Sequence, residues 1–426
     1  MKFENTLAFA RQLDEEDTLK KFRDRFYIPI VNGKECIYFT GNSLGLQPKT
    51  TQDYVLTELE DWANYGVEGH FHAKNPWVSY HEIFPELIAP IVGALPEEVV
   101  VMNQLTVNLH LLMTSFYRPT KERFKIICEA KAFPSDQYAF QSQATIHGLD
   151  PNEVIIEVGP KEGSAYIETS DIIDAIKKNG HQTALVIFGG VNYYSGQVFN
   201  MQQICKAAHE AGAYCGFDLA HAAGNVHLDL HDWNIDFACW CSYKYLNSGP
   251  GGVAGAFIHQ QHITNKQLPR LAGWWGHDKE NRFKMEHNFR PIPTAEGWQL
   301  SNAPVLSMAA HKASLDIFSE VGMHNLISKG TLLSNYLLYI LNEINQKVEN
   351  KIIEIITPIN ESEKGCQVSM LMLKDGRKIF EALMKAGVIA DWREPNVIRI
   401  APVPLYNTFE DVFTFGQIIK NFVEQI

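Results

Sequence analysis

Residues 236–252 read DFACWCSYKYLNSGPGG, and the rest of the chain is best understood from this stretch. An apolar, strand-like run ends at a single lysine, Lys244, with a tyrosine on each side and a glycine-rich turn after it. An amine held between walls of low polarity becomes a better nucleophile. A structural lysine that simply marks the end of a strand would give the same sequence pattern. The other parts of the chain must therefore decide between a catalytic and a structural lysine.

The composition indicates a folded protein with more than one domain. Of its 426 residues, 46% are hydrophobic, which is enough for a large core shared by two domains. The formal net charge is -12, from 37 basic and 49 acidic residues, so we do not expect nucleic-acid binding. Its 7 cysteines lack metal-binding spacing, as is typical of a reduced, cytoplasmic protein. The acidic start without an apolar run predicts no signal peptide, and no stretch predicts a membrane span.

Apolar strand-like runs alternate with amphipathic helical segments through the middle of the chain. This alternation predicts an α/β fold with a mainly parallel sheet covered by helices. Ligands of such sheets bind beyond the carboxyl ends of the strands. We expect strands at residues 99–103, 124–128, 154–158, 183–188, 213–217 and 253–258, and helices at 105–116, 169–178 and 201–211.

The last third of the chain has its own pattern and predicts a smaller α+β domain. We expect one long helix over residues 305–341, strands at 352–356, 367–373 and 397–400, a helix at 376–386 and a terminal helix. An amphipathic helix is expected within residues 5–26. The predicted division is an N-terminal segment, 1–45, packing with the small domain, a large domain, 46–309, and the small domain, 310–426.

A carboxylate and a lysine emerge from neighbouring strand ends. Asp218 ends one predicted strand, and the next delivers Lys244. Pyridoxal 5'-phosphate needs such a pair, since its aldehyde condenses with a lysine and a carboxylate keeps its ring nitrogen protonated. Thr106 opens a predicted helix, where it is either an anion seat for the phosphate or an ordinary cap. Phe133 could stack on a flat ring, whereas Ser135 and Asp136 would serve equally well as capping residues.

Two other motifs have simpler explanations. Residues 249–254, GPGGVA, fit a loose dinucleotide pattern, but an apolar strand rather than a helix follows, so we interpret them as a tight turn. His70 and His72 have the spacing of two metal ligands on a strand, yet no third ligand with fitting context is visible. We therefore expect no metal site. A loop histidine that touches substrate and a solvated loop both remain possible.

The chain resembles the kynureninase family, pyridoxal-phosphate enzymes of fold type I in the aminotransferase class V group. The resemblance covers nearly the whole chain in the family's order. It is carried by GNSLGLQP (41–48), LTVNLHLL (105–112), EAKAFPSDQYA (129–139), FDLAHAAGN (217–225), CSYKYLNSGPGG (241–252), LAGWWGH (271–277), SNAP (301–304) and IRIAPVPLYN (398–407).

The resemblance implies roles for individual residues. Lys244 would hold the cofactor covalently, Asp218 would pair with the ring nitrogen, and Tyr243 is a candidate proton donor. Trp274 and Asn302 would reach the cofactor from the other subunit of a homodimer. The implied cofactor contacts are Leu105, Thr106, Phe133, Pro134, Ser135, Asp136, Asp218, His221, Tyr243, Lys244, Trp274 and Asn302.

The resemblance also implies a substrate site. Arg399 would grip the α-carboxylate of the substrate in bidentate fashion. His70, Ser301 and Asn302 would lie at the aromatic end, as in relatives that favour 3-hydroxykynurenine. One departure is visible, because Gly189 stands where relatives are expected to carry a small hydroxyl residue, which puts one polar cofactor contact in doubt.

The implied activity is hydrolysis of a carbon–carbon bond next to a ketone, in tryptophan degradation or NAD biosynthesis. Kynurenine or 3-hydroxykynurenine would give anthranilate or 3-hydroxyanthranilate and alanine. Two alternatives stay open. A cysteine desulfurase of the same fold would need a nucleophilic cysteine, for which Cys366 is the candidate, although an apolar strand follows it. A non-catalytic module of this fold would not need Lys244, Asp218 and Arg399 together.

Overall fold

The computed structural model describes residues 2–347 and 351–424, and its largest element is a seven-stranded sheet. The strand order is β4-β10-β9-β8-β7-β5-β6. Strands β5 to β9 pair in parallel, whereas β10 is antiparallel to both its neighbours. This confirms the predicted α/β fold. The strands are β4 (Val99–Val101), β5 (Lys125–Glu129), β6 (Ile155–Val158), β7 (Thr183–Gly189), β8 (Tyr214–Asp218), β9 (Phe237–Trp240) and β10 (Gly255–Ile258).

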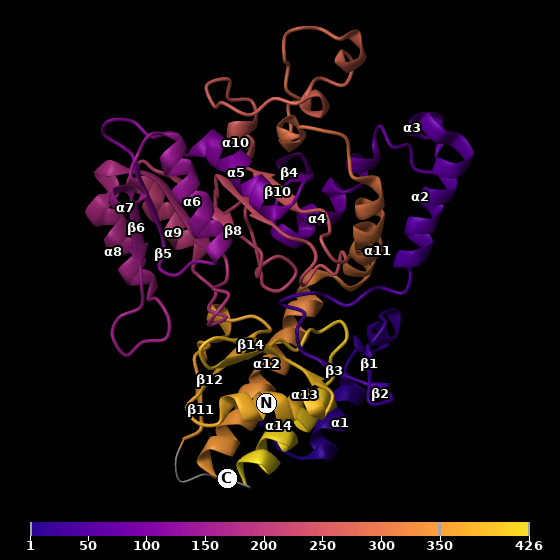
Figure 1. The fold of residues 1–426 in the computed structure, drawn as a ribbon, viewed down its shortest axis with the longest axis vertical. Helices are drawn as coiled ribbons and strands as arrows, with labels where there is room; N and C mark the ends of the chain where they lie inside the picture. The colour runs from indigo at the N-terminus through magenta and orange to yellow at the C-terminus, as the bar shows by residue number, and fades with distance from the viewer. Residues whose placement is uncertain (1, 348–350, 425–426) are drawn as a thin grey trace.

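Strands β7 to β10 are buried on both faces of the sheet, which explains why they are almost entirely apolar. In β7, Val186 and Phe188 belong to one apolar cluster, whereas Leu185 and Ile187 belong to another on the opposite face. The first face is covered by α4 (Pro85–Val92), α8 (Thr169–Asn179), α9 (Met201–Glu210) and α11 (Val305–Val321). The second is covered by α5 (Leu105–Phe116) and α6 (Pro134–Ile146). Figure 1 shows this layered part above the second sheet.

A second, antiparallel sheet has the order β11-β12-β15-β14. Its strands are β11 (Ile353–Ile355), β12 (Val368–Met372), β14 (Asp391–Arg393) and β15 (Val397–Ile400). Its apolar cluster is shared with α12 (Met323–Gln346), α13 (Gly376–Lys385) and α14 (Phe409–Val423).

The beginning of the chain packs against the end of the chain in this second part. Helix α1 (Leu7–Glu16) contributes Ala10 and Leu13 to the shared apolar cluster. Strand β3 (Ile37–Tyr38) pairs in parallel with β13 (Val388–Ile389), while β1 (Ile30–Val31) and β2 (Lys34–Glu35) form a small hairpin. Figure 1 shows these indigo and yellow segments side by side. No helix of the described residues is both long and apolar enough to cross a membrane.

Three sequence-based expectations about elements were wrong. The long helix predicted over 305–341 is two helices, because Gly322 has a φ of +76°, which ends α11 before α12 begins. The segment with His70 and His72, expected as a loop, is the single turn of α3 (Gly69–His72), after α2 (Thr51–Tyr65). The helix expected within residues 5–26 ends at Glu16, and a separate 3₁₀ helix follows at Lys20–Arg25.

The core contains one histidine without a polar partner. His311 of α11 is fully buried, and its ring lies 6.0 Å from that of Phe84. Neither ring nitrogen has a hydrogen-bond partner. Burial lowers the pKa of His311 to about 3, so the imidazole is neutral in the folded protein.

This histidine should destabilise the protein in mild acid. The folded-state pKa, about 3, lies below the unfolded value of 6.5. The unfolded chain therefore binds the extra proton between these values, and stability falls as the pH decreases through this window, by about 1.4 kcal/mol per pH unit. Between pH 6.5 and pH 5, the free energy of unfolding measured in urea should fall by about 2 kcal/mol less for His311→Leu than for wild type. Parallel pH dependences for the two proteins would contradict this.

Candidate active site

A cavity of about 300 Å³ opens at the carboxyl ends of β5, β7 and β8 and beside the segment that follows β9. This is the position at which parallel α/β sheets bind ligands. Its lining residues are Gln104, Leu105, Thr106, Glu129, Phe133, Ser135, Asp136, Gly189, Val191, Tyr193, Asp218, Ala220, His221, Cys241, Tyr243 and Lys244. Most of the residues expected to hold the cofactor therefore meet around one cavity, and Pro134 lies beside it as the first residue of α6.

The lysine lies next to an imidazole and over an aromatic ring. Nζ of Lys244 is 3.0 Å from Nε2 of His221 and 5.9 Å from the centre of the Phe133 ring. Burial lowers the pKa of His221 well below its ordinary value, and the charge of Lys244 lowers it further. The neutral imidazole can thus accept a hydrogen bond from the ammonium group.

Two buried carboxyl groups lie deeper in the cavity. Asp218 ends β8, and its Oδ1 accepts the Ala220 N–H at 2.7 Å. Burial raises the pKa of Asp218, while that N–H and the charge of Lys244 oppose the rise. Burial raises the pKa of Asp136 more strongly, and the charge of Asp218 adds to this effect. Asp136 is therefore the member that holds a proton, and Asp218 is the charged one.

The start of α5 also lines the cavity and can bind an anion such as a phosphate group. Leu105 and Thr106 are the first residues of this helix, so their N–H groups have no partner within it. The hydroxyl oxygens of Thr106 and Ser135 lie 2.8 Å apart, and Tyr243 also lines the cavity. Burial raises the pKa of the Tyr243 phenol, which keeps it protonated and able to donate.

Arg399 lies on β15, an inner strand of the second sheet, and does not itself line the cavity. It is 1% exposed, and its guanidinium binds the Asp391 carboxylate and the carbonyl oxygen of Tyr193. Tyr193 itself lines the cavity. The arginine is therefore held in place by contacts within the protein, one residue away from the site.

Four of the predicted site residues lie elsewhere in this chain. Trp274 is 43% exposed, and its indole N–H donates to the carbonyl of Arg282 at 3.0 Å. Ser301 and Asn302 are exposed, and His70 lies in α3 with its Nδ1 2.9 Å from the Val67 carbonyl oxygen. None of these four lines the cavity around Lys244. A single subunit thus supplies only part of the set that the sequence predicts.

Sequence reasoning missed three residues at or near the cavity, namely Glu129, Tyr193 and Asp391. Glu129 ends β5 just as Asp218 ends β8, so the same rule about strand ends would have found it. Tyr193 lies in a loop, and Asp391 lies on a short strand beside Arg399. No comparable signal in the sequence points to these two.

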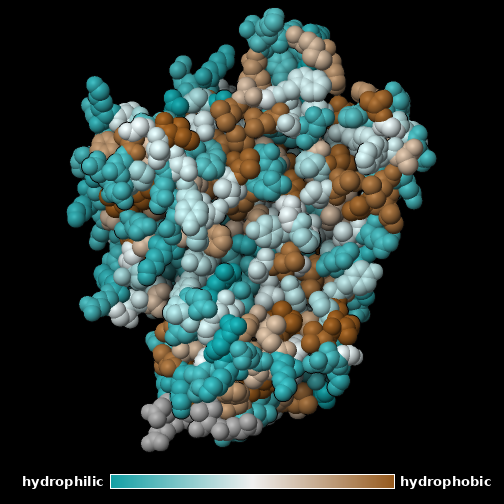
Figure 2. All heavy atoms as spheres, viewed as in Figure 1, coloured by the Kyte–Doolittle hydropathy of each residue, from teal (hydrophilic) through white to brown (hydrophobic). Residues whose placement is uncertain are grey.

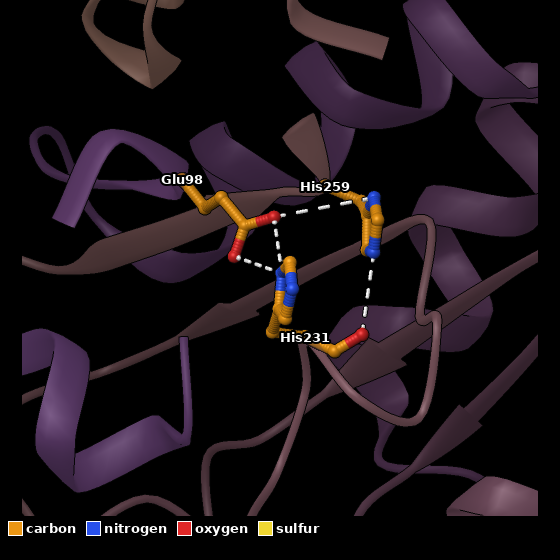
Figure 3. Close-up of side chains that lie close together, drawn as sticks. All are labelled: Glu98, His231 and His259. Atoms are coloured by element: carbon orange, nitrogen blue, oxygen red, sulfur yellow. Dashed lines mark hydrogen bonds and ion pairs between the residues drawn. The ribbon is translucent and has the colours of Figure 1, made fainter. Parts of the chain in front are cut away.

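A separate cluster of Glu98, His231 and His259 has the spacing of metal ligands (Figure 3). Nδ1 of His231 lies 2.9 and 3.1 Å from the two oxygens of Glu98, which also accept N–H groups of Leu95 and Gln260. The two imidazole rings are stacked at an interplanar angle of 3°. Imidazole lone pairs lie in the ring plane, so those of the two histidines lie in parallel planes about one ring stack apart and do not converge on one point, which favours a hydrogen-bond network over a metal centre.

The polar groups of the cavity fit one class of ligand. Nδ1 of His221 and Oδ1 of Asp136 are buried and have no hydrogen-bond partner. Together with an amine, a charged carboxylate, an aromatic wall and an anion seat, they suit a flat, polar, phosphorylated ring that carries an aldehyde. The residues present thus fit the cofactor that the sequence predicts.

Comparison with known proteins places the chain in a family. It is 57% identical to kynureninase of Flavobacterium psychrophilum over 420 residues, which cover 99% of each chain. The chain belongs to the kynureninase family. A family model described as the kynureninase C-terminal domain matches residues 327–419, and mouse kynureninase is 46% identical over 97% of this chain and 93% of its own. The family predicted from the motifs is therefore confirmed.

Solved structures of low sequence identity share the fold. This kynureninase-family chain superimposes on a cysteine desulfurase from Thermococcus onnurineus with a TM-score of 0.76 at 19% sequence identity. The match covers 96% of this chain and 98% of the desulfurase chain. A complex of the cystine C–S lyase C-DES gives a TM-score of 0.75 at 16% identity, over 90% of this chain and 97% of that one. These likenesses confirm the predicted fold-type I architecture.

Proposed function

We propose that this kynureninase-family chain is a pyridoxal-phosphate-dependent hydrolase that cleaves the Cβ–Cγ bond of L-kynurenine or its 3-hydroxy form. Water adds to the γ-carbonyl, and the products are L-alanine and anthranilate or 3-hydroxyanthranilate, in tryptophan degradation or NAD biosynthesis. The convergence of Lys244, His221 and Asp218 in one cavity carries the proposal. The 57% identity to a kynureninase over almost the full length supports the choice of reaction.

Each residue of the site has a separate role in the proposed reaction. When bound, the cofactor supplies an electron sink for charge that develops at the substrate's α-carbon. Lys244 removes and returns protons at the α- and β-carbons, and neutral His221 at 3.0 Å can share the proton on Nζ. The negatively charged Asp218 would lie opposite the ring nitrogen and keep that nitrogen protonated. Arg399 orients the substrate's α-carboxylate, and Tyr243 holds a proton for the oxygen of the γ-carbonyl.

The direct test is turnover by the purified protein with added pyridoxal phosphate. We expect equimolar alanine and anthranilate from kynurenine, and the corresponding hydroxylated product from 3-hydroxykynurenine.

Sulfide released from cysteine would favour a desulfurase instead. Burial argues against that activity, because Cys366 is 2% exposed, lies outside the Lys244 cavity, and has a pKa raised to about 12. A protein that stays colourless with the cofactor would favour a non-catalytic module.

We further propose a homodimer whose subunits share each active site. Trp274, Ser301 and Asn302 are exposed and do not line the cavity of their own subunit, so a partner subunit offers them a function. An apolar groove close to Ser301 and Asn302 is lined by Trp62, Trp77 and residues 303–306, and Trp62 is 61% exposed. Figure 2 shows hydrophobic side chains on this face of α2 and α11. Burying it against a second copy would stabilise the pair.

Mixing two inactive variants tests the shared site. In a dimer of one Lys244→Ala and one Trp274→Ala subunit, one site carries both changes and the other carries neither. After the two variants are unfolded and refolded together, we expect activity to recover to about a quarter of wild type, because half of the random dimers are hybrids with one intact site. Each variant refolded alone is the control and should stay inactive. No recovery in a mixture that demonstrably forms hybrids would contradict site sharing.

We also propose the predicted domain division at residues 45/46 and 309/310, and a cytoplasmic location. The apolar cluster of the four-stranded part is separate from the two clusters of the seven-stranded part, which supports two domains. Helix α11 belongs to the first cluster as far as Val321, beyond the proposed boundary at 309/310. The location is supported by the state of the cysteines, since all seven are free and buried.

A further inference from the structure

The carboxylate of Glu129 is built into the cavity without a role in the steps above. It ends β5, is 4% exposed, and lines the same cavity as Asp136 and Asp218. We propose that Glu129 is a positioning residue, which holds the loop of residues 190–197 so that this loop joins the cofactor seat to the substrate-binding Arg399. The proposal rests on the proposed function, since it concerns the same site.

Glu129 binds this loop and the strand end before it through fixed donors. Its Oε1 accepts the Gly189 N–H at 3.1 Å, and its Oε2 accepts the side-chain amide of Asn192 at 2.7 Å. The amide oxygen of Asn192 in turn accepts the N–H groups of Tyr194 and Ser195 and the Ser195 hydroxyl, at 2.9 to 3.1 Å. The amide therefore cannot flip, and its N–H₂ group must face Glu129.

The anchored loop places Tyr193 between two functional groups. The Tyr193 ring meets that of Phe133 edge-on, with centres 5.3 Å apart and an interplanar angle of 82°. Its carbonyl oxygen accepts hydrogen bonds from Arg399 and, at 3.0 Å, from Gln367. One loop residue thus supports both the aromatic wall of the cofactor seat and the guanidinium expected to bind substrate. Glu129 fixes this residue through the neighbouring Asn192.

Glu129 also accounts for the glycine at position 189. A Cβ at this position would come within 2.8 Å of Oε1 of Glu129, which is too close for a non-bonded contact. The Glu129 oxygen therefore fills the space that a side chain at 189 would need. It brings an acceptor to the place where the resemblance led us to expect a hydroxyl group.

Glu129→Gln is the sharpest test because it keeps the shape of the side chain. Whichever way the new amide is oriented, its N–H₂ group faces a donor, either the Gly189 N–H or the Asn192 amide. We expect the KM for kynurenine and the dissociation constant of pyridoxal phosphate from the apoprotein each to rise about tenfold, the effect of losing one charge-assisted hydrogen bond. We expect kcat to change less than KM, because no reacting group is lost.

Two further variants separate this role from general damage. Glu157→Gln makes the same change at an exposed residue of the neighbouring strand β6 and should leave all three constants unchanged. Asn192→Ala removes the donor at the other end of the contact and should raise KM and the cofactor's dissociation constant similarly. Because the two side chains act on the loop together, through the hydrogen bond that joins them, the double variant should lose less than the sum of the two single effects.

Three results would overturn the proposal. The first is wild-type KM and cofactor affinity in a folded Glu129→Gln protein, or in Asn192→Ala if the former does not fold. The second is full additivity of the two changes. The third is a fall in kcat alone, which would place Glu129 in the chemistry itself. If the wild-type protein did not act on kynurenine, the proposed function would fail, while the cofactor titration would still test Glu129.

Discussion

Replacing Lys244 with alanine should abolish turnover and the retention of the cofactor together. The side chain is the single lysine at the cavity, and its Nζ contacts His221 at 3.0 Å. Without this amine, the cofactor has no group to which it can bind covalently, and no base remains to transfer the proton at the α-carbon of the substrate. We expect kcat/KM for kynurenine to fall by at least about 10³-fold.

Two measurements distinguish this loss from unfolding. Wild-type protein should keep its cofactor absorbance through gel filtration, whereas Lys244→Ala should lose it. Lys121→Ala removes an exposed lysine remote from the cavity and is the matched control, for which no change is expected. Turnover and visible absorbance that survive in Lys244→Ala would show that the central assignment is wrong.

The residues predicted most securely are those that end strands of the parallel sheet. Lys244 and Asp218 follow apolar runs of four or five residues, and the structure brings them to one cavity because parallel strands end at one edge. Glu129 obeys the same rule. It lies one residue beyond the predicted strand, 124–128, whereas β5 extends to Glu129 in the structure.

Other features depend on contacts that a sequence does not reveal. Tyr193 binds Arg399 through its backbone carbonyl, and this contact joins residues 206 positions apart in the sequence. Asp391 forms an ion pair with Arg399 only 8 positions away, because β14 and β15 pair side by side. The break at Gly322 was missed because apolar spacing continues on both sides of it, so the glycine's φ of +76° decides. The roles predicted for Trp274 and Asn302 rest on the proposed homodimer, because neither residue lines the cavity around Lys244 in the single chain.

Replacing each of the two buried carboxyl groups by an amide should have very different effects on kcat/KM. Asp218 is the charged member of the pair, and Asp136 holds the proton, because the pKa of Asp136 is raised more strongly by burial and by Asp218. Asparagine resembles a protonated aspartic acid in shape and charge. Asp136→Asn should therefore change kcat/KM by less than about tenfold, while Asp218→Asn removes a charge that the site uses.

For Asp218→Asn we expect kcat/KM to fall by about 10²–10⁴-fold, since removing one partner of a buried ion pair costs roughly 3–5 kcal/mol. The amide oxygen can still accept the Ala220 N–H, now 2.7 Å from Oδ1, so the fold should survive. Unfolding midpoints close to that of wild type check this point, and steady-state kinetics of both variants measure the contrast. If Asp136→Asn proved as damaging as Asp218→Asn, the charge would be shared between them or lie on Asp136. If both variants were nearly as active as wild type, no buried negative charge would be needed opposite the ring nitrogen, and the role given to Asp218 would be wrong.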